Sequence, residues 1–161
     1  MSKSKATIIR RAQSVSNPYF PIYLSGFVDG EGCFMVSAAP RKSLKVRWEL
    51  RPSFSVSQNG DRAQVLAMMK EYFGCGSIRP DRSDKTLKYE IRSLTDLITK
   101  VIPHFERYPL LSAKQVSFIG FRDICYAMQQ GEHLSPDHIG SLIALASSLN
   151  QGKRKYIFGK I

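Results

Sequence analysis

The stretch Leu24-Ser25-Gly26-Phe27-Val28-Asp29-Gly30-Glu31-Gly32 decides the predicted fold, because it is an apolar segment that ends in two acids. Pro18 and Pro21 are tolerated only near a helix start, and the apolar residues after them cover most of a helical circumference. This pattern predicts a helix buried nearly all round. Gly26 costs such a helix about 1 kcal/mol relative to alanine, so we expect a packing reason for it, such as the close approach of a second helix.

The two acids of this stretch stand where a helix macrodipole disfavours negative charge. Gly30 and Gly32 flank Glu31 and suit a helix end that turns at once into a strand. Asp29 and Glu31 then lie at the negative end of the helix dipole, and a bound cation would explain their presence there. From these features alone, a cation site and a pair of merely solvated acids are equally good interpretations.

The charge of the chain favours a polyanionic partner. The 161 residues include 24 Lys and Arg against 13 Asp and Glu, a formal net charge of +11. Nucleic acid is the leading candidate, and an anionic membrane is the alternative. The length suits one domain, expected over residues 19–150, with a basic N-terminal arm over 1–18 and a basic tail over 151–161. No apolar run could span a bilayer and no secretory signal is recognisable, which predicts an intracellular protein without a membrane partner.

Periodic patterns divide the expected domain into two hairpins and several helices. Apolar and polar residues alternate with period two over residues 45–58, which predicts a long strand with one buried and one solvent-exposed face. A strand over 33–38 completes the first hairpin, and residues 76–82 and 85–92 form a second one that turns near Ser83-Asp84. Helices are predicted over 61–73, with Asp61 as its cap, and over 95–102, 112–129 and 135–149.

This order of elements predicts an α+β fold with the arrangement αββαββα. Its antiparallel sheet would carry helices on one face and be open on the other. A half-exposed strand is polar on its wet side in most proteins, so the pattern alone does not require a ligand. The positive net charge and the continuation of the polar face over both hairpins favour insertion into a DNA groove. The residues expected to contact DNA are Ser37, Arg41, Lys45, Arg47, Glu49, Arg51, Ser53, Ser55, Arg79, Lys88, Glu90 and Arg92.

The nine residues from Leu24 to Gly32 resemble the LAGLIDADG motif that names a family of homing endonucleases. The match includes both glycines, both acids and their spacing, with glutamate in place of the final aspartate. The resemblance extends over about residues 19–149 and implies the family's saddle of antiparallel strands astride DNA, with helices behind. It also implies a site-specific homing endonuclease that binds a long, near-palindromic double-stranded DNA site, hydrolyses both strands and leaves short 3′ overhangs.

The resemblance implies roles for residues at the cleavage site. Glu31 corresponds to the family's metal ligand, with the backbone carbonyl of Gly30 beside it. Ligation by oxygen alone suits Mg²⁺, which other divalent cations such as Mn²⁺ can replace. Gln58 corresponds to a polar residue near the attacking water, although an ordinary strand-terminal residue is the alternative. The family's basic residue corresponds to Lys114 or, two positions earlier, to Ser112.

One copy of the motif occurs in the chain, whereas the family's cleavage site uses two such acids. We therefore expect a C2 homodimer in which the motif helices pack through Tyr23, Gly26 and Phe27. Asp29, whose side chain should diverge from that of Glu31, is expected to be structural. Two alternatives use the same scaffold without cleavage, namely a group I intron maturase that binds intron RNA and a DNA-binding regulator. The expected compartment is a mitochondrion, a chloroplast or a bacterial cytoplasm.

Overall fold

A computed structural model describes residues 17–81 and 85–150 of the chain. The predicted order of elements is confirmed: helix, hairpin, helix, hairpin and a final run of helices. The strands and helices are α2 (Phe20–Glu31), β1 (Gly32–Pro40), β2 (Trp48–Asn59), α3 (Gln64–Phe73), β3 (Ser77–Pro80), β4 (Thr86–Ile91), α4 (Leu94–Asp96), α5 (Ile102–Arg107), α6 (Lys114–Gln129) and α7 (Pro136–Leu149). Short helical turns cover η1 (Gly60–Arg62), η2 (Leu97–Val101) and η3 (Glu132–Leu134). The arm predicted over 1–18, except residues 17 and 18, the tail predicted over 151–161 and the turn predicted at Ser83-Asp84 lie outside the described residues.

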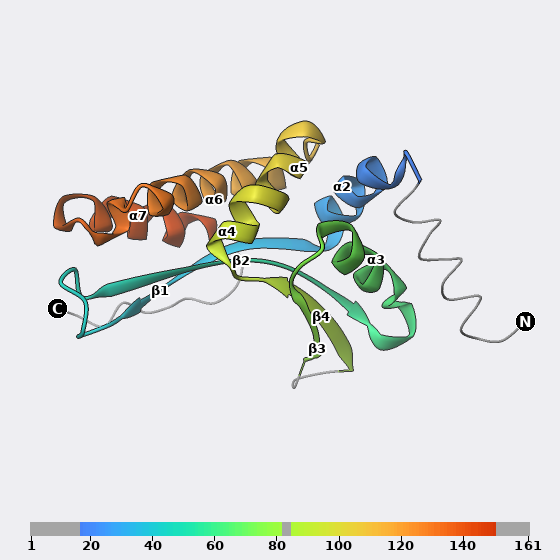
Figure 1. Cartoon of the computed structure of the whole chain (residues 1–161), viewed down its shortest axis with the longest axis horizontal. Coiled ribbons are helices and arrows are strands. Elements are labelled where there is room, and N and C mark those ends of the chain that lie inside the picture. Colours follow the sequence, from blue (N-terminus) through green and yellow to red (C-terminus); the bar gives the residue numbers. More distant parts are fainter. Residues whose placement is uncertain (1–16, 82–84, 151–161) are drawn as a thin grey trace, which may run out of the picture.

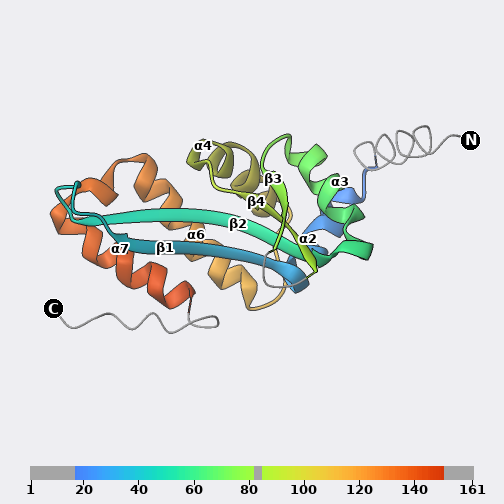
Figure 2. The ribbon, with the colours of Figure 1, turned by 90° about the horizontal axis from the view of Figure 1, so that it is seen from below.

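The strands form one antiparallel sheet in the order β1-β2-β4-β3. The first hairpin pairs Gly32 with Val56 and Pro40 with Trp48. β2 then extends beyond β1 and pairs with β4, which joins the second hairpin to the first. The helices lie above the sheet in Figure 1, and Figure 2 looks onto the uncovered face. The predicted α+β fold, with an antiparallel sheet covered by helices on one face, is therefore confirmed.

The core between sheet and helices is built from aromatic rings. Phe34 of β1 stacks on Phe54 of β2 with ring centroids 5.2 Å apart, and contacts Phe105, Phe118 and Phe121 from α5 and α6 at 5.2 to 5.4 Å. Burial of such rings dominates core energetics, and it fixes which face of each strand points inward. Because side chains alternate along a strand, the neighbouring positions must point to the open side of the sheet.

Two local predictions at the ends of elements are wrong. β2 begins at Trp48, not at residue 45, because residues 41–47 form a turn closed by a hydrogen bond from Arg41 N to Arg47 O at 2.8 Å. Arg47 adopts a left-handed φ of 61° there, which an extended strand does not allow. Asp61 lies in η1, and Ala63 precedes α3 instead.

The helix predicted over 95–102 is longer than expected and continues to Arg107. Pro103 favours a helix end near residue 102, because proline lacks a backbone N–H and usually breaks a helix. The π-helical turn η2 widens the helix just before Pro103, so the proline falls in the first turn of α5. Within the described residues, no helix is both long and apolar enough to cross a bilayer.

Candidate DNA interface and cleavage site

The motif helix α2 is buried on one face only, which corrects the prediction that it is buried nearly all round. Leu24 and Val28 are buried in the core, whereas Tyr19, Ile22 and Tyr23 are exposed at 74, 61 and 52%. A Cβ atom added at Gly26 would meet nothing within 4 Å. The described part of the chain therefore supplies no packing partner for Gly26.

Glu31 is the last residue of α2, and Gly32 begins β1. A Cβ atom at Gly32 would lie 2.8 Å from the carbonyl oxygen of Val28, so this abrupt change from helix to strand requires glycine. The Glu31 side chain is exposed, and no side chain in residues 17–81 and 85–150 forms a hydrogen bond or ion pair with its carboxylate. The junction therefore presents a carboxylate to solvent at the negative end of a helix dipole.

Asp29, the other acid of the motif, holds the segment that leads into α6. Its Oδ2 accepts hydrogen bonds from Leu111 N and Ser112 N, both at 3.0 Å, and the Ser112 hydroxyl donates to its Oδ1. The hydrogen bond from the Ser112 side chain is the main cause that lowers the pKa of Asp29. These hydrogen bonds support the structural role predicted for Asp29.

Lys114 and Ser112 take different places beside the motif helix. Lys114 Nζ donates to the carbonyl oxygen of Val28 at 3.1 Å, so its ammonium lies at the C-terminal end of α2, where the dipole favours a cation. The Ser112 hydroxyl is used by Asp29 and also accepts a hydrogen bond from Lys114 N at 3.1 Å. Of the two residues, Lys114 therefore brings the positive charge towards the junction, and its catalytic role stays a prediction.

Gln58 lies in β2 near the same junction. Gly32 pairs with Val56, and Gln58 lies two residues further along β2, opposite Leu87 of β4. Its side chain is partly exposed. The register thus places Gln58 beside the point where α2 passes into β1, and its role at an attacking water also stays a prediction.

The junction offers oxygen atoms of the kind that bind divalent cations. Mg²⁺ accepts carboxylate and carbonyl oxygens, which the exposed Glu31 and the backbone of Gly30 can offer together. Among the residues that the structure describes, no group of three or more His, Cys, Asp or Glu side chains could hold a metal ion.

The sheet register collects the predicted DNA-contact residues on one surface. Ser37 pairs with Arg51, and Lys88 pairs with Arg79. We use "open face" for the sheet surface that carries these side chains and, at further positions of the same alternation, Glu49, Ser53, Ser55, Glu90 and Arg92. Arg41, Lys45 and Arg47 extend this surface from the exposed turn between β1 and β2, although Lys45 and Arg47 were predicted to lie in the strand.

The open face is less exposed to solvent than predicted. Ser53 and Ser55 are only 5 and 6% exposed, and Glu90 is 5% exposed. Both glutamates of this face are surrounded by cations. Glu49 Oε2 lies 2.7 Å from Arg41 and 2.7 Å from Arg51, and the hydrogen bond from Arg51 is the main cause that lowers the pKa of Glu49 to about 2.

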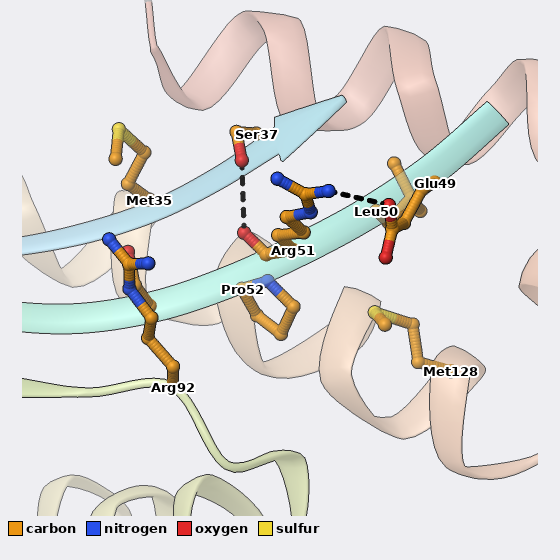
Figure 3. A pocket seen from close by; sticks show the side chains of 9 residues that line it. Met35, Ser37, Glu49, Leu50, Arg51, Pro52, Arg92 and Met128 are labelled. Carbon is orange, nitrogen blue, oxygen red and sulfur yellow. Dashed lines mark hydrogen bonds and ion pairs between the residues drawn. The ribbon is translucent and has the colours of Figure 1, made fainter. Parts of the chain in front are cut away.

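A hollow of about 420 Å³ lies beside β2 and is lined by residues of β1 and β2 together with Arg92 and Met128. Figure 3 shows Arg51 turned towards Glu49 on one side and Arg92 on the other, with the Met35 side chain nearby. Met35 is absent from the predicted DNA contacts because it is apolar, although the period-two pattern places it on the outer face. An apolar side chain on a DNA-facing surface can contact a thymine methyl group.

A buried hydrogen-bonded chain fixes the inner face of α2, and no local sequence pattern indicates it. Ser25 Oγ lies 3.1 Å from His104 Nε2, and Tyr72 Oη lies 2.9 Å from His104 Nδ1. Ser25 also donates to the carbonyl of Tyr108 at 2.7 Å. Burial lowers the pKa of His104 to about 4, so the imidazole is neutral near pH 7. These contacts tie the motif helix to α3 and α5.

Comparisons with known proteins agree with this architecture. The family model described as "LAGLIDADG endonuclease" matches residues 24–125. "Probable intron-encoded endonuclease 3" of Neurospora crassa is 32% identical over 133 residues, which are 82% of this chain but only 25% of that relative. The crystal structure of the homing endonuclease I-TnaI superposes with a TM-score of 0.77 at 35% identity and covers 83% of this chain and 89% of its own. The I-SmaMI LAGLIDADG homing endonuclease bound to cleaved DNA gives a TM-score of 0.78 at 28% identity over 83% of this chain and 45% of its own.

Proposed function

Since this chain belongs to the LAGLIDADG endonuclease family, we propose that it is a homing endonuclease that binds a long, near-palindromic double-stranded DNA site as a homodimer and cuts both strands. The observation that carries this proposal is the exposed Glu31 carboxylate at the junction of α2 and β1, at the position of the motif's final acid. A basic open face next to this junction supports DNA as the substrate. Relatives named as intron-encoded endonucleases support a role in intron homing, while intron RNA as a partner and the cellular compartment stay predictions.

A second copy would cover the outer face of α2. Tyr23 is half-exposed on this helix, Phe27 is partly exposed, and Gly26 has open space around its Cα. Two helices that cross at small residues can approach closely, and the exposed aromatic rings would then be buried between them. Leu111 is 95% exposed and is held by its backbone N–H to Asp29, so it adds an apolar contact to the proposed interface.

The proposed homodimer brings a second Glu31 to the junction and doubles the oxygen ligands. A divalent cation, Mg²⁺ or in its place Mn²⁺, would be held there by Glu31 and the carbonyl of Gly30 and would polarise the scissile phosphate and the attacking water. Gln58 would orient that water through its amide. Lys114, which the Val28 carbonyl holds in place, would stabilise the negative charge that develops on the phosphate oxygens.

The open face would bind the duplex on both sides of the cleavage site. Arg51 and Arg92 keep side-chain exposures of 60 and 64%, so their guanidinium groups can reach phosphates or guanine edges. Arg41, Lys45 and Arg47 at the exposed turn would contact the outer part of each half-site. Cuts staggered across the dimer axis would leave the short 3′ overhangs expected from the resemblance.

The test is cleavage of a duplex that spans an intron insertion site. Native protein and the variant Glu31→Gln are incubated with this DNA in the presence of Mg²⁺, Ca²⁺ or EDTA. The proposal predicts cleavage by the native protein with Mg²⁺ alone, and DNA binding without cleavage by the variant. Glu132→Gln removes an exposed acid on the η3 turn and serves as the matched control, which should cleave like the native protein. Metal-dependent cleavage that survives Glu31→Gln would overturn the proposed function.

A further inference from the structure

Glu90 is an acid buried on the surface that should meet DNA. Its side chain is 4% exposed, and it lies in β4 between Ser55 of β2 and Ser77 of β3. A negative charge on a DNA-binding surface repels the phosphates and lowers affinity. We therefore expect the Glu90 carboxylate to act on neighbouring residues and not on DNA directly.

Three cations converge on this carboxylate. Arg79 Nη2 lies 2.6 Å from Glu90 Oε2, and Arg92 Nε lies 3.0 Å from the same oxygen. Lys88 Nζ lies 3.5 Å from Oε1. The cations come from β3, from β4 and from the residue that follows β4, so the single acid links two neighbouring strands.

The two arginines are held by Glu90 and still face solvent. The side chain of Arg79 is 51% exposed and that of Arg92 is 64% exposed. A guanidinium group has five N–H donors, and the carboxylate uses one or two of them on each arginine. The remaining donors are available on the open side of the sheet.

We propose that Glu90 is a positioning residue that holds Arg79 and Arg92 in fixed orientations for the recognition of base edges. This inference rests on the proposed function. A guanine edge binds an arginine in one planar, bidentate geometry, whereas a phosphate accepts a cation from many directions. Fixing the arginines before DNA binds reduces the side-chain entropy lost in the specific complex, so Glu90 would raise sequence discrimination.

The proposal and simple charge counting predict different results for Glu90→Gln. Loss of one negative charge should tighten binding to any DNA, specific or not. Released arginines should also bind phosphates wherever they reach them. We therefore expect the variant to bind unrelated DNA more tightly and to lose about tenfold in the ratio of specific to non-specific affinity.

The experiment measures this ratio on two duplexes of equal length and composition. One is the sequence that the native protein selects from a randomised pool, and the other is a scrambled version of it. Titrations over a series of salt concentrations give both affinities and the salt slope, which should steepen for Glu90→Gln by about 0.9 for each additional phosphate that the released arginines neutralise. The matched control is Glu106→Gln, which removes an acid paired with Arg122 at 3.7 Å in the helical layer and should leave the ratio unchanged.

A charge-preserving variant keeps the inference testable if Glu90→Gln does not fold. Arg79→Lys changes the geometry of an exposed cation without changing its charge. It should lower the ratio while the salt slope stays at the native value. If the native protein binds the selected duplex more tightly than the scrambled one, and the variants show the same ratio of affinities, Glu90 has no positioning role. Equal affinity of the native protein for both duplexes would overturn the proposed function and this inference together.

Discussion

Replacing Gly26 with leucine separates the stability of one folded chain from the pairing of two chains. Gly26 lies within α2, and an added Cβ atom would meet nothing within 4 Å. Leucine is a far better helix former than glycine, by roughly 0.8 kcal/mol. At concentrations where the chain is monomeric, we therefore expect the free energy of unfolding to rise by about 0.5–1 kcal/mol and Tm to rise by about 1–4 °C.

The same leucine stands where a second motif helix would approach. Extra side-chain bulk in a close-packed contact costs about 1–3 kcal/mol at each site, and a symmetric dimer contains two such sites. The total of about 2–6 kcal/mol corresponds to a loss of at least about thirtyfold in the association constant. Cleavage should fall in parallel, because the proposed site needs Glu31 from both copies.

The assay combines sedimentation velocity over a concentration series with cleavage of the selected DNA duplex. Gly140→Leu is the matched control, since Gly140 also lies inside an exposed helix, α7, and its added Cβ would also meet nothing within 4 Å. That variant should show the same rise in stability and keep both dimer and cleavage. A Gly26→Leu protein that dimerises and cleaves like the native one would refute pairing through the outer face of α2.

Three further predictions concern the residues around α2. Burial lowers the pKa of His104 from 6.5 to about 4, so the unfolded chain takes up a proton on the imidazole at a higher pH than the folded chain does. Up to about 3 kcal/mol of unfolding free energy should therefore be lost as the pH falls from 6.5 to 4. His104→Gln should flatten this part of a urea-unfolding series. Asp29→Asn should cost about 1 kcal/mol at neutral pH, and the difference from native protein should vanish as the pH falls through the lowered pKa of Asp29, whereas a pH-independent difference would exclude the carboxylate as the cause. Lys114→Met should slow single-turnover cleavage by about a hundredfold with unchanged DNA affinity, and an equal loss of affinity would identify Lys114 as a phosphate anchor instead.

The architecture is predictable because the core and the motif leave local patterns in the sequence. The period-two alternation that places Phe54 and Val56 inside also places Arg51 outside, and the sheet register agrees. The motif indicates both the helix end at Glu31 and the change to a strand at Gly32. The part of the turn over residues 41–47 that runs from Lys45 to Arg47 escapes prediction because the same alternation continues through both residues, and the left-handed φ of Arg47 interrupts it.

The contacts within the candidate site could not be predicted from local patterns, because they join distant parts of the chain. Ser25 and His104 are 79 residues apart, and Asp29 and Ser112 are 83 residues apart. The choice between Lys114 and Ser112 at the junction depends on this second contact. The burial of Glu90 follows from the pairing of β4 with both β2 and β3, which the alternation of a single strand does not reveal.

A cleavage site shared by two copies is tested most directly with mixed dimers. Native and Glu31→Gln chains are co-expressed or refolded together in varying proportions, and the rate of double-strand cleavage is measured with DNA in excess at constant total protein. If each double-strand cut needs Glu31 from both copies, the rate falls as the square of the native fraction, and an equal mixture keeps about one quarter of the native rate. A rate that falls in direct proportion to the native fraction, and so keeps about one half in the equal mixture, would contradict a site built from two copies of Glu31.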